Sequence, residues 1–208
     1  MLQRLVPAIL AAAIVSLPVA AGMAFAESAS AEPVRVRGAI ENFGGNTLTV
    51  KTREGPTVDI ALAQGWMISG VAPAAVADIK PGDYVGIASL PTAGGGDGAL
   101  EVVIFPAALK GTGEGSYGWD LKPNSTMTNA TVADAVKDVN GQTVTVSYHG
   151  QEKKIAVPTG TPVVTLAPAT AADLKPGAAV FVSGEKDASG AISAQRVVVG
   201  SKGVAPPM

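Results

Sequence analysis

The sequence predicts an all-β protein that contains two copies of one small barrel. The chain has 25 glycines and 15 prolines among 208 residues, and Val and Thr are also abundant. Val and Thr favour pleated strands, whereas Gly and Pro mark turns. Short segments such as Thr47–Val50 alternate polar and apolar residues, as half-buried strands do. The phrase "DIKPGDYV" at 78–85 returns as "DLKPGAAV" at 173–180, which indicates an internal repeat.

Other segments recur in the same order. "GNTLTV" at 45–50 matches "GQTVTV" at 141–146, and "GALEVVIF" at 98–105 is followed at a similar spacing by "GAISAQRVVV" at 190–199. The preserved order and spacing predict two units, 34–106 and 129–200. Residues 107–128 are then expected to form a linker, and residues 201–208 a disordered tail.

Each unit begins with three predicted strands. In the first unit they cover 34–43, 47–50 and the segment around Val58, Ile60 and Leu62, with Leu48 and Val50 facing a core. In the second unit Asn140-Gly141 is a hairpin signal. It precedes a strand at 143–146 and a third strand that contains Ile155 and Val157.

An alanine-rich segment follows in each unit, "PAAVADIKPG" and "PATAADLKPG". Alanine favours helix, and Pro81 and Pro176 end it, so we expect one short helix or turn between strands three and four. Gly82 and Gly177 suit the position of a type II turn that needs a positive φ.

This segment is interpreted as a structural joint that leads into strand four, at 83–90 and 178–185. Asp78 and Asp173 are expected to accept backbone N–H bonds, and Ile79 and Leu174 to close the bottom of a barrel. The alternative is a binding role for the Asp-Lys pairs. A fifth strand then ends each unit.

Three strands, a short helix and two strands is the order of the OB-fold, so the sequence predicts two tandem OB-like β-barrels. Three motifs extend the comparison: Gly38-Ala39-Ile40, Asp173-Leu174-Lys175-Pro176-Gly177 and Gly190–Val197. With them the chain resembles a family of exported bacterial domains of unknown function. The first unit departs from the pattern at Leu100-Glu101, where the family has a small residue. The resemblance implies an OB-like barrel and brings no known activity.

The first 26 residues are typical of a secretory signal peptide. Arg4 is their one charged residue, the segment Leu5–Ala21 is apolar or small apart from Ser16, and Ala24-Phe25-Ala26 is a cleavage signature. Cleavage after Ala31 and an uncleaved anchor are the alternatives, although Pro18 interrupts the apolar run. No membrane span is expected after Ala26. A periplasmic or secreted location follows.

Composition argues against several classes of function. The chain has no cysteine, which excludes disulfides, thiolate metal sites and lipid attachment. With 17 acidic against 15 basic residues and no basic cluster larger than Lys153-Lys154, nucleic acid is not an expected partner. His149 is the single histidine and no Gly-x-Ser-x-Gly elbow occurs, so we expect no metal, no cofactor and no enzyme.

The segment between the units carries the least generic residues. Gly113–Gly118 satisfies G-x-G-x-x-G, but Pro106 precedes it and Glu114 would repel a phosphate, so a flexible linker is the better interpretation. Polar residues beside one aromatic then form a candidate ligand site, because such sets bind sugars or peptides. Its members are Trp119, Asp120, Asn124, Ser125, Thr126, Thr128 and Asn129.

In the competing interpretation this segment is an ordered loop. Trp119 then fills a groove between the barrels, and the Ser, Thr and Asn side chains bond to turn backbones. Trp66 is expected to cap a barrel.

The expected function is a non-catalytic binding or interaction module of the cell envelope, with a protein or an envelope glycan as partner. One alternative is an accessory periplasmic component of a transport or envelope-assembly system. Another is a glycan-acting enzyme with two carboxylates about 5–10 Å apart.

Overall fold

The computed structural model describes residues 31–201 and 203–206, so the predicted signal peptide lies outside the described residues. The described chain is all-β, as predicted, and contains no helix long and apolar enough to cross a membrane. The strands are β1 (Glu32–Gly44), β2 (Thr47–Thr52), β3 (Thr57–Ala74), β4 (Tyr84–Pro91), β5 (Asp97–Phe105), β6 (Gly115–Gly118), β7 (Thr126–Asp138), β8 (Gly141–Tyr148), β9 (Gln151–Pro158), β10 (Val163–Ala167), β11 (Ala179–Lys186) and β12 (Ile192–Gly200).

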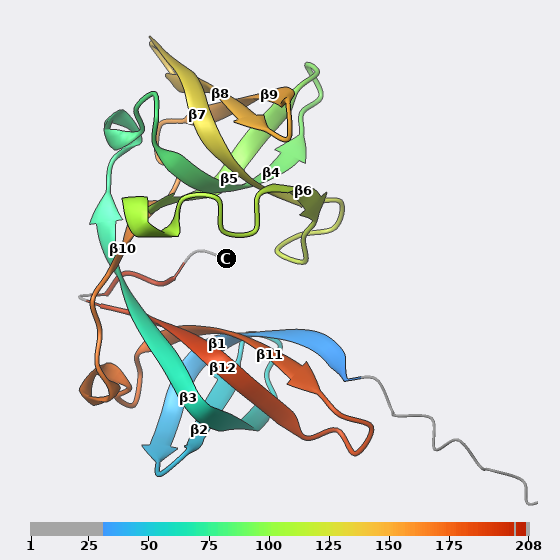
Figure 1. Ribbon diagram of the computed structural model, residues 1–208, viewed down its shortest axis with the longest axis vertical. Helices are drawn as coiled ribbons and strands as arrows, with labels where there is room; N and C mark the ends of the chain where they lie inside the picture. The colour runs from blue at the N-terminus through green and yellow to red at the C-terminus, as the bar shows by residue number, and fades with distance from the viewer. Residues whose placement is uncertain (1–30, 202, 207–208) are drawn as a thin grey trace, which may run out of the picture.

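Five strands close the first barrel, which is the lower one in Figure 1. Strand β1 pairs with β2 and β11, β2 pairs with β3, and β12 joins β11 to β3. The β12–β3 pairing is parallel and the others are antiparallel. The core is apolar; its fully buried members include Ile40, Leu48, Val50 and Ile60.

The second barrel has the same pattern of pairing. Strand β7 pairs with β4 and β8, β8 with β9, and β4 with β5. A short parallel pairing of Asp97 and Gly98 with Ile155 and Ala156 completes the ring. The Lys153 ammonium lies 2.8 Å from the Asp97 carboxylate and joins β9 to β5 at the same place.

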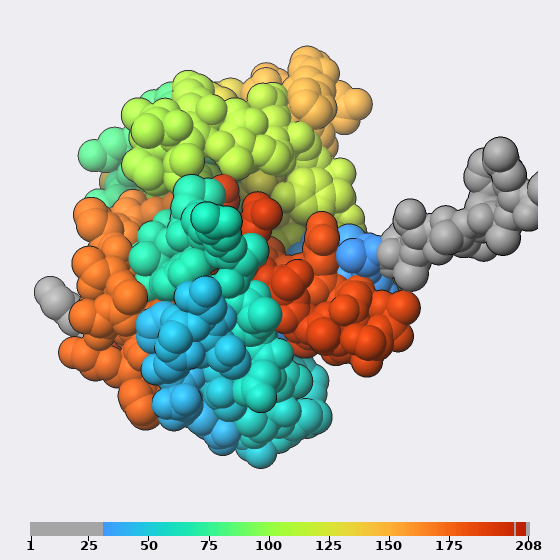
Figure 2. Space-filling model, turned by 60° about the horizontal axis from the view of Figure 1, so that its bottom comes forward, coloured from blue at the N-terminus to red at the C-terminus, as the bar shows by residue number. Residues whose placement is uncertain are grey.

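The strand pairing corrects the expectation of two barrels built from the contiguous units 34–106 and 129–200. The first barrel takes β1, β2 and β3 from the first unit but β11 and β12 from the second. The second barrel takes β7, β8 and β9 from the second unit but β4 and β5 from the first. Figure 2 shows the C-terminal strands beside the N-terminal ones on one face of the molecule.

The two expected joints are short 3₁₀ helices, η1 (Val76–Asp78) and η3 (Ala171–Asp173). The Asp78 carboxylate accepts a 2.8 Å hydrogen bond from the Ala75 N–H, and Asp173 accepts one of 2.8 Å from the Thr170 N–H. The hydrogen bonds from the Thr170 N–H and the Thr170 hydroxyl hold the pKa of Asp173 below its usual range. The carboxylates therefore serve their own turns, as predicted.

The Pro-Gly turn after each 3₁₀ helix reaches into the barrel of the other unit. Gly82 and Gly177, which follow Pro81 and Pro176, have φ values of 92° and 84°, as a type II turn requires. The Gly82 N–H donates to the Val132 carbonyl of β7 at 2.8 Å, and the Gly177 N–H donates to the Ile40 carbonyl of β1 at 2.8 Å.

The residues expected to close the barrels follow the same exchange. Ile79 is buried in the core of the second barrel and Leu174 in the core of the first. The joint of the first unit therefore closes the second barrel, and the joint of the second unit closes the first barrel. In each case this is the barrel to which the two strands after the joint belong.

Strands β3 and β10 hold the two barrels together. Strand β3 continues beyond the first barrel and pairs with β10, which in turn runs parallel to β5 of the second. A third buried cluster fills the space between the barrels; its buried members are Val71, Val103, Val164, Phe181 and Val198.

The expected linker and tail also pack against the barrels. Residues 107–128 contain η2 (Ala107–Leu109) and strand β6, which pairs along β7. In the expected tail, the Ser201 hydroxyl donates to the Val71 carbonyl at 2.7 Å, and Val204 packs against the third cluster. The described part of the tail is therefore not a disordered extension.

The exchange of strands predicts that the two fragments stay associated when the chain is cut between the units. A specific protease site inserted at the exposed segment Gly111–Gly113 should be cleaved, and the two fragments should still elute together at the mass of the intact chain. Light scattering after size-exclusion chromatography measures this mass. The same sample in denaturant is the control, because unfolding should separate the fragments. Separation under native conditions would contradict the exchange.

Candidate functional site

A pocket of about 340 Å³ lies between the two barrels. The outer face of the first barrel forms one wall, through β3, β11 and β12. The opposite wall comes from β5, β7 and the segment between these two strands of the second barrel, which includes β6 and which we call the connecting segment. The lining residues are Met67, Ser69, Phe105, Leu109, Thr112, Gly113, Tyr117, Trp119, Asn129, Leu166, Phe181, Ser183, Arg196 and Val198.

Strand register arranges the wall of the first barrel in two rows. Phe181 lies opposite Val198, and Val198 opposite Ser69, which makes one row across β11, β12 and β3. Phe181 is 6% exposed, Val198 is 5% exposed and Ser69 is partly exposed, so we call this the buried row after its two apolar members. In the next row Arg196 lies between Ser183 and Met67, and Met67 is 55% exposed. The wall is therefore apolar inside and polar at its outer edge.

Trp119 is packed between the barrels by aromatic and cationic neighbours. Its ring centroid lies 6.4 Å from that of Phe181 and 6.1 Å from that of Tyr117. The Arg35 guanidinium lies 4.1 Å from the Trp119 ring centroid, which is a cation–π contact. Trp119 thus occupies the groove of the competing interpretation and also lines the pocket.

Asp120 fastens this loop to the first barrel. Its carboxylate lies 2.8 Å from the Arg37 guanidinium and 3.8 Å from that of Arg35. Partial burial would raise the pKa of Asp120, but the hydrogen bond and charge of Arg37, with the charge of Arg35, outweigh it and lower the pKa. We call this contact the Asp120 latch.

Three other predicted site residues serve the loop and do not line the pocket. The Ser125 hydroxyl is buried 2.8 Å from the Lys122 carbonyl and 2.9 Å from the Trp119 carbonyl. Thr126 bonds to Ser89 at 3.2 Å. Asn124 is exposed and has a φ of 63°, which suits a turn.

Asn129 does line the pocket. Its amide donates to the Gly113 carbonyl at 3.1 Å and to the Tyr117 hydroxyl at 3.0 Å, so it ties β7 to the connecting segment. Thr128, its neighbour, bonds to Ser116 at 3.0 Å. A Cβ on Gly86 would lie 2.8 Å from Asn129 Oδ1, and the missing side chain therefore makes room for this wall.

Two phenols take part in the hydrogen bonds of the connecting segment, Tyr84 as a donor and Tyr117 as the acceptor from Asn129. The buried Tyr84 hydroxyl donates to the Thr112 carbonyl at 3.0 Å, and burial, with a smaller contribution from Glu114, raises the pKa of Tyr84 to about 12. Burial also raises the pKa of Tyr117, against the opposing charge of Arg35. Both groups stay protonated at neutral pH.

The Trp119 Nε1 atom is buried and has no hydrogen-bond acceptor in the described part of the chain. Such an unpaired donor costs about 1–3 kcal/mol, and a buried Trp N–H usually finds a partner. The ring borders the main pocket and a smaller one of about 60 Å³.

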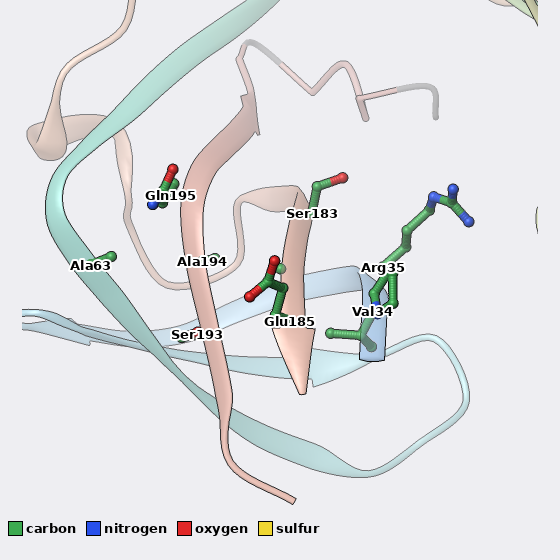
Figure 3. A pocket seen from close by; sticks show the side chains of 10 residues that line it. Val34, Arg35, Ala63, Ser183, Glu185, Ser193, Ala194 and Gln195 are labelled. Atoms are coloured by element: carbon green, nitrogen blue, oxygen red, sulfur yellow. The ribbon is translucent and has the colours of Figure 1, made fainter. Parts of the chain in front are cut away.

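A further pocket on the first barrel, of about 320 Å³, is a weaker candidate. Figure 3 shows that the Arg35 side chain extends away from Glu185 rather than toward it. That guanidinium is instead engaged by Trp119 and Asp120. The polar side chains of this pocket therefore do not converge on a common point.

Metal chemistry finds no support in the described residues, which contain no group of three potential His, Cys, Asp or Glu ligands. His149 has a φ of 46° in the turn between β8 and β9, and its backbone N–H donates to the Glu114 carboxylate at 3.0 Å. Trp66 packs against the first core beside Phe43, with ring centroids 5.9 Å apart.

Comparison with protein-family models, with curated proteins and with solved structures finds no match to this chain. The site therefore has to be argued from its own geometry.

Sequence reasoning found Trp119 and Asn129 but missed the wall of the first barrel, including Phe181, Val198 and Arg196. A signal was present in the strands that carry them. The runs "AVFV" at 179–182 and "VVV" at 197–199 are apolar on both faces, as expected of strands with two buried faces.

The Asp120 latch predicts a pH-dependent contribution to stability. Asp120→Asn should lower the free energy of unfolding by about 1–2 kcal/mol at pH 7, because it leaves the nearly buried Arg37 without its carboxylate; the exposure of Asp120 keeps the loss below that of a buried pair. The folded-state pKa is lowered from 3.8, so this contribution is present above pH 3.8 and is lost as the pH falls through the folded value.

Urea denaturation of both proteins from pH 7 to pH 2.5 measures the difference. Asp134→Asn, at an exposed position on β7, is the control for the loss of one charge. If the difference in the free energy of unfolding between the two proteins stays constant below pH 3.8, the ionised Asp120 carboxylate is not the source of this stability.

Proposed function

We propose that this chain is an exported, non-catalytic binding module of the bacterial cell envelope, and that its ligand enters the pocket between the two barrels. Export is supported by the sequence of residues 1–26. The binding role is supported by the pocket, and the site residues proposed for it are Trp119 and Asn129 with the two rows of the first barrel.

A pocket lined mainly by apolar and aromatic side chains from both barrels carries this proposal. Ligand sites are concave and mostly apolar, with a few polar groups that fix orientation. This pocket has that character.

The lining favours a ligand that presents an apolar group over an unmodified glycan. The Arg35 guanidinium already lies 4.1 Å from the Trp119 ring centroid and occupies a face on which a sugar would stack. Phe105, Leu166 and Val198 offer no hydrogen bonds to hydroxyl groups. A partner with an aromatic or branched apolar group therefore fits better.

A non-catalytic role agrees with the electrostatics of the carboxyl groups. Asp120, Asp173 and Asp187 have pKa values shifted downward by hydrogen bonds or by neighbouring charges. A glycan-cleaving general acid needs a raised pKa instead.

We interpret each barrel as an OB-like barrel whose last two strands come from the other repeat. Each ring combines the three first strands of one unit with the 3₁₀ helix and the last two strands of the other, so each ring contains one full set of the elements of an OB-fold. The inter-barrel pocket is then a product of the exchange and is not the usual ligand face of a single OB barrel.

Binding of a neutral apolar probe tests the proposed function. In a Trp66→Phe background Trp119 is the sole tryptophan. N-phenyl-1-naphthylamine should bind saturably with one site per chain, and energy transfer from Trp119 to the dye should report it. Ser69→Phe, which fills the buried row of the pocket, should weaken the dye by about tenfold or more.

Thr57→Phe is the matched control, because it adds the same side chain at an exposed position of the same strand. Equal loss in both variants would mean that the dye responds to the added phenyl ring and not to the pocket. Saturable binding that Ser69→Phe leaves unchanged, or no saturable binding at all, would overturn the proposed function.

A further inference from the structure

We infer that the ligand of the inter-barrel pocket is a small organic carboxylate, with its apolar body against Phe181 and Val198 and its carboxylate at Arg196. This inference rests on the proposed function and names the chemical class of the ligand.

Arg196 has the position that such a ligand requires. It lies at the centre of the outer row, between Ser183 of β11 and Met67 of β3. Val198, two residues further along the same strand and on the same face, belongs to the buried apolar row. A molecule whose body covers the buried row therefore brings its head group to the guanidinium and to the Ser183 hydroxyl.

No carboxylate of the described residues neutralises the charge of Arg196. Arg35 and Arg37 both pair with the Asp120 carboxylate, but Arg196 forms no ion pair with any described residue. Its side chain is exposed and lines the mouth of the pocket. An arginine at this place attracts an anion, and its planar donors match a carboxylate with two parallel hydrogen bonds.

The same face already holds one carboxylate, that of Asp120, which lies 2.8 Å from the Arg37 guanidinium and 3.8 Å from that of Arg35. Arg35 lies opposite Ser183, which lies opposite Arg196, so the two arginines belong to one row of the sheet. The latch carboxylate of Asp120 occupies the Arg35 end of that row, next to the aromatic ring of Trp119. A ligand carboxylate at Arg196 would repeat this arrangement of an acid beside an apolar body.

The size and lining of the pocket limit the apolar body. A volume of about 340 Å³ is near the lower end of the range for ligand pockets, roughly 300–1,000 Å³, so the ligand is small. Phe105, Trp119 and Phe181 surround the space with aromatic edges and faces. An aromatic or branched aliphatic body satisfies these surfaces, whereas a polar body would lose hydrogen bonds to water without replacement.

Displacement of N-phenyl-1-naphthylamine from the full chain tests the inference. The probes are 4-phenylbutyrate, its amide and 4-phenylbutylamine, which share one body and differ in the charge of the head. At pH 7 we expect the carboxylate to displace the dye at about tenfold lower concentration than the amide, and the amine to be weakest. Added salt should reduce the advantage of the carboxylate.

Arg196→Gln should remove the preference for the carboxylate over the amide, with each displacement constant calculated from the dye affinity of the variant itself. Arg53→Gln is the matched control, because it removes the same charge at an exposed position that does not line this pocket. A preference that survives in Arg196→Gln, or disappears equally in Arg53→Gln, would overturn the assignment to Arg196.

The two proposals fail in different ways. If the dye binds in the pocket but the carboxylate and the amide displace it equally, or neither displaces it, the carboxylate inference is wrong and the binding pocket stands. If the dye itself does not bind there, the proposed function is wrong, and the carboxylate inference is wrong with it.

Discussion

The rest of the structure depends on where the chain goes after each Pro-Gly turn. Gly82 donates its N–H to β7 and Gly177 donates its N–H to β1, so each turn is fixed to the first strand of the other unit. The following strands then complete a ring that the other unit began. Neither unit supplies all five strands of one ring. Each barrel needs two strands from the other unit, and the two barrels therefore fold as one structure.

The contact between β3 and β10 shows the same reciprocity. Matching "DIKPG" at 78–82 with "DLKPG" at 173–177 aligns Val71 with Leu166, and the register pairs these two residues with each other. On either side, Gly70 pairs with Ala167 and Ala72 with Thr165. A residue of one repeat thus pairs with the counterpart of its neighbour in the other repeat, and the reverse pair is also present. This reciprocal pairing is the pattern of a two-fold interface. The two halves of one chain therefore meet as the subunits of a symmetric dimer do.

Local patterns predicted the strands and the turns but not the partners of the strands. Leu48 and Val50 are fully buried, as their alternation indicates, and Gly82 has the predicted positive φ. The alternation of polar and apolar residues shows which face of a strand is buried. Contiguous and exchanged barrels bury the same faces, so this pattern cannot distinguish between them. The candidate site was found in part for the same reason. Trp119 and Asn129 were visible in one segment, whereas Phe181, Val198 and Arg196 reach the pocket from strands far away in the sequence.

The pocket lies between the two barrels, so a ligand bound there as proposed would contact both of them. One wall belongs to the first barrel, and the other belongs to the second barrel, including the connecting segment between its strands β5 and β7. The Asp120 latch and the aromatic contacts of Trp119 close that segment over the space. A molecule that contacts both walls binds the assembled pair of barrels and gains nothing from a chain in which they have separated. By mass action it must therefore stabilise the exchanged arrangement, so binding and the integrity of the fold are linked at one place.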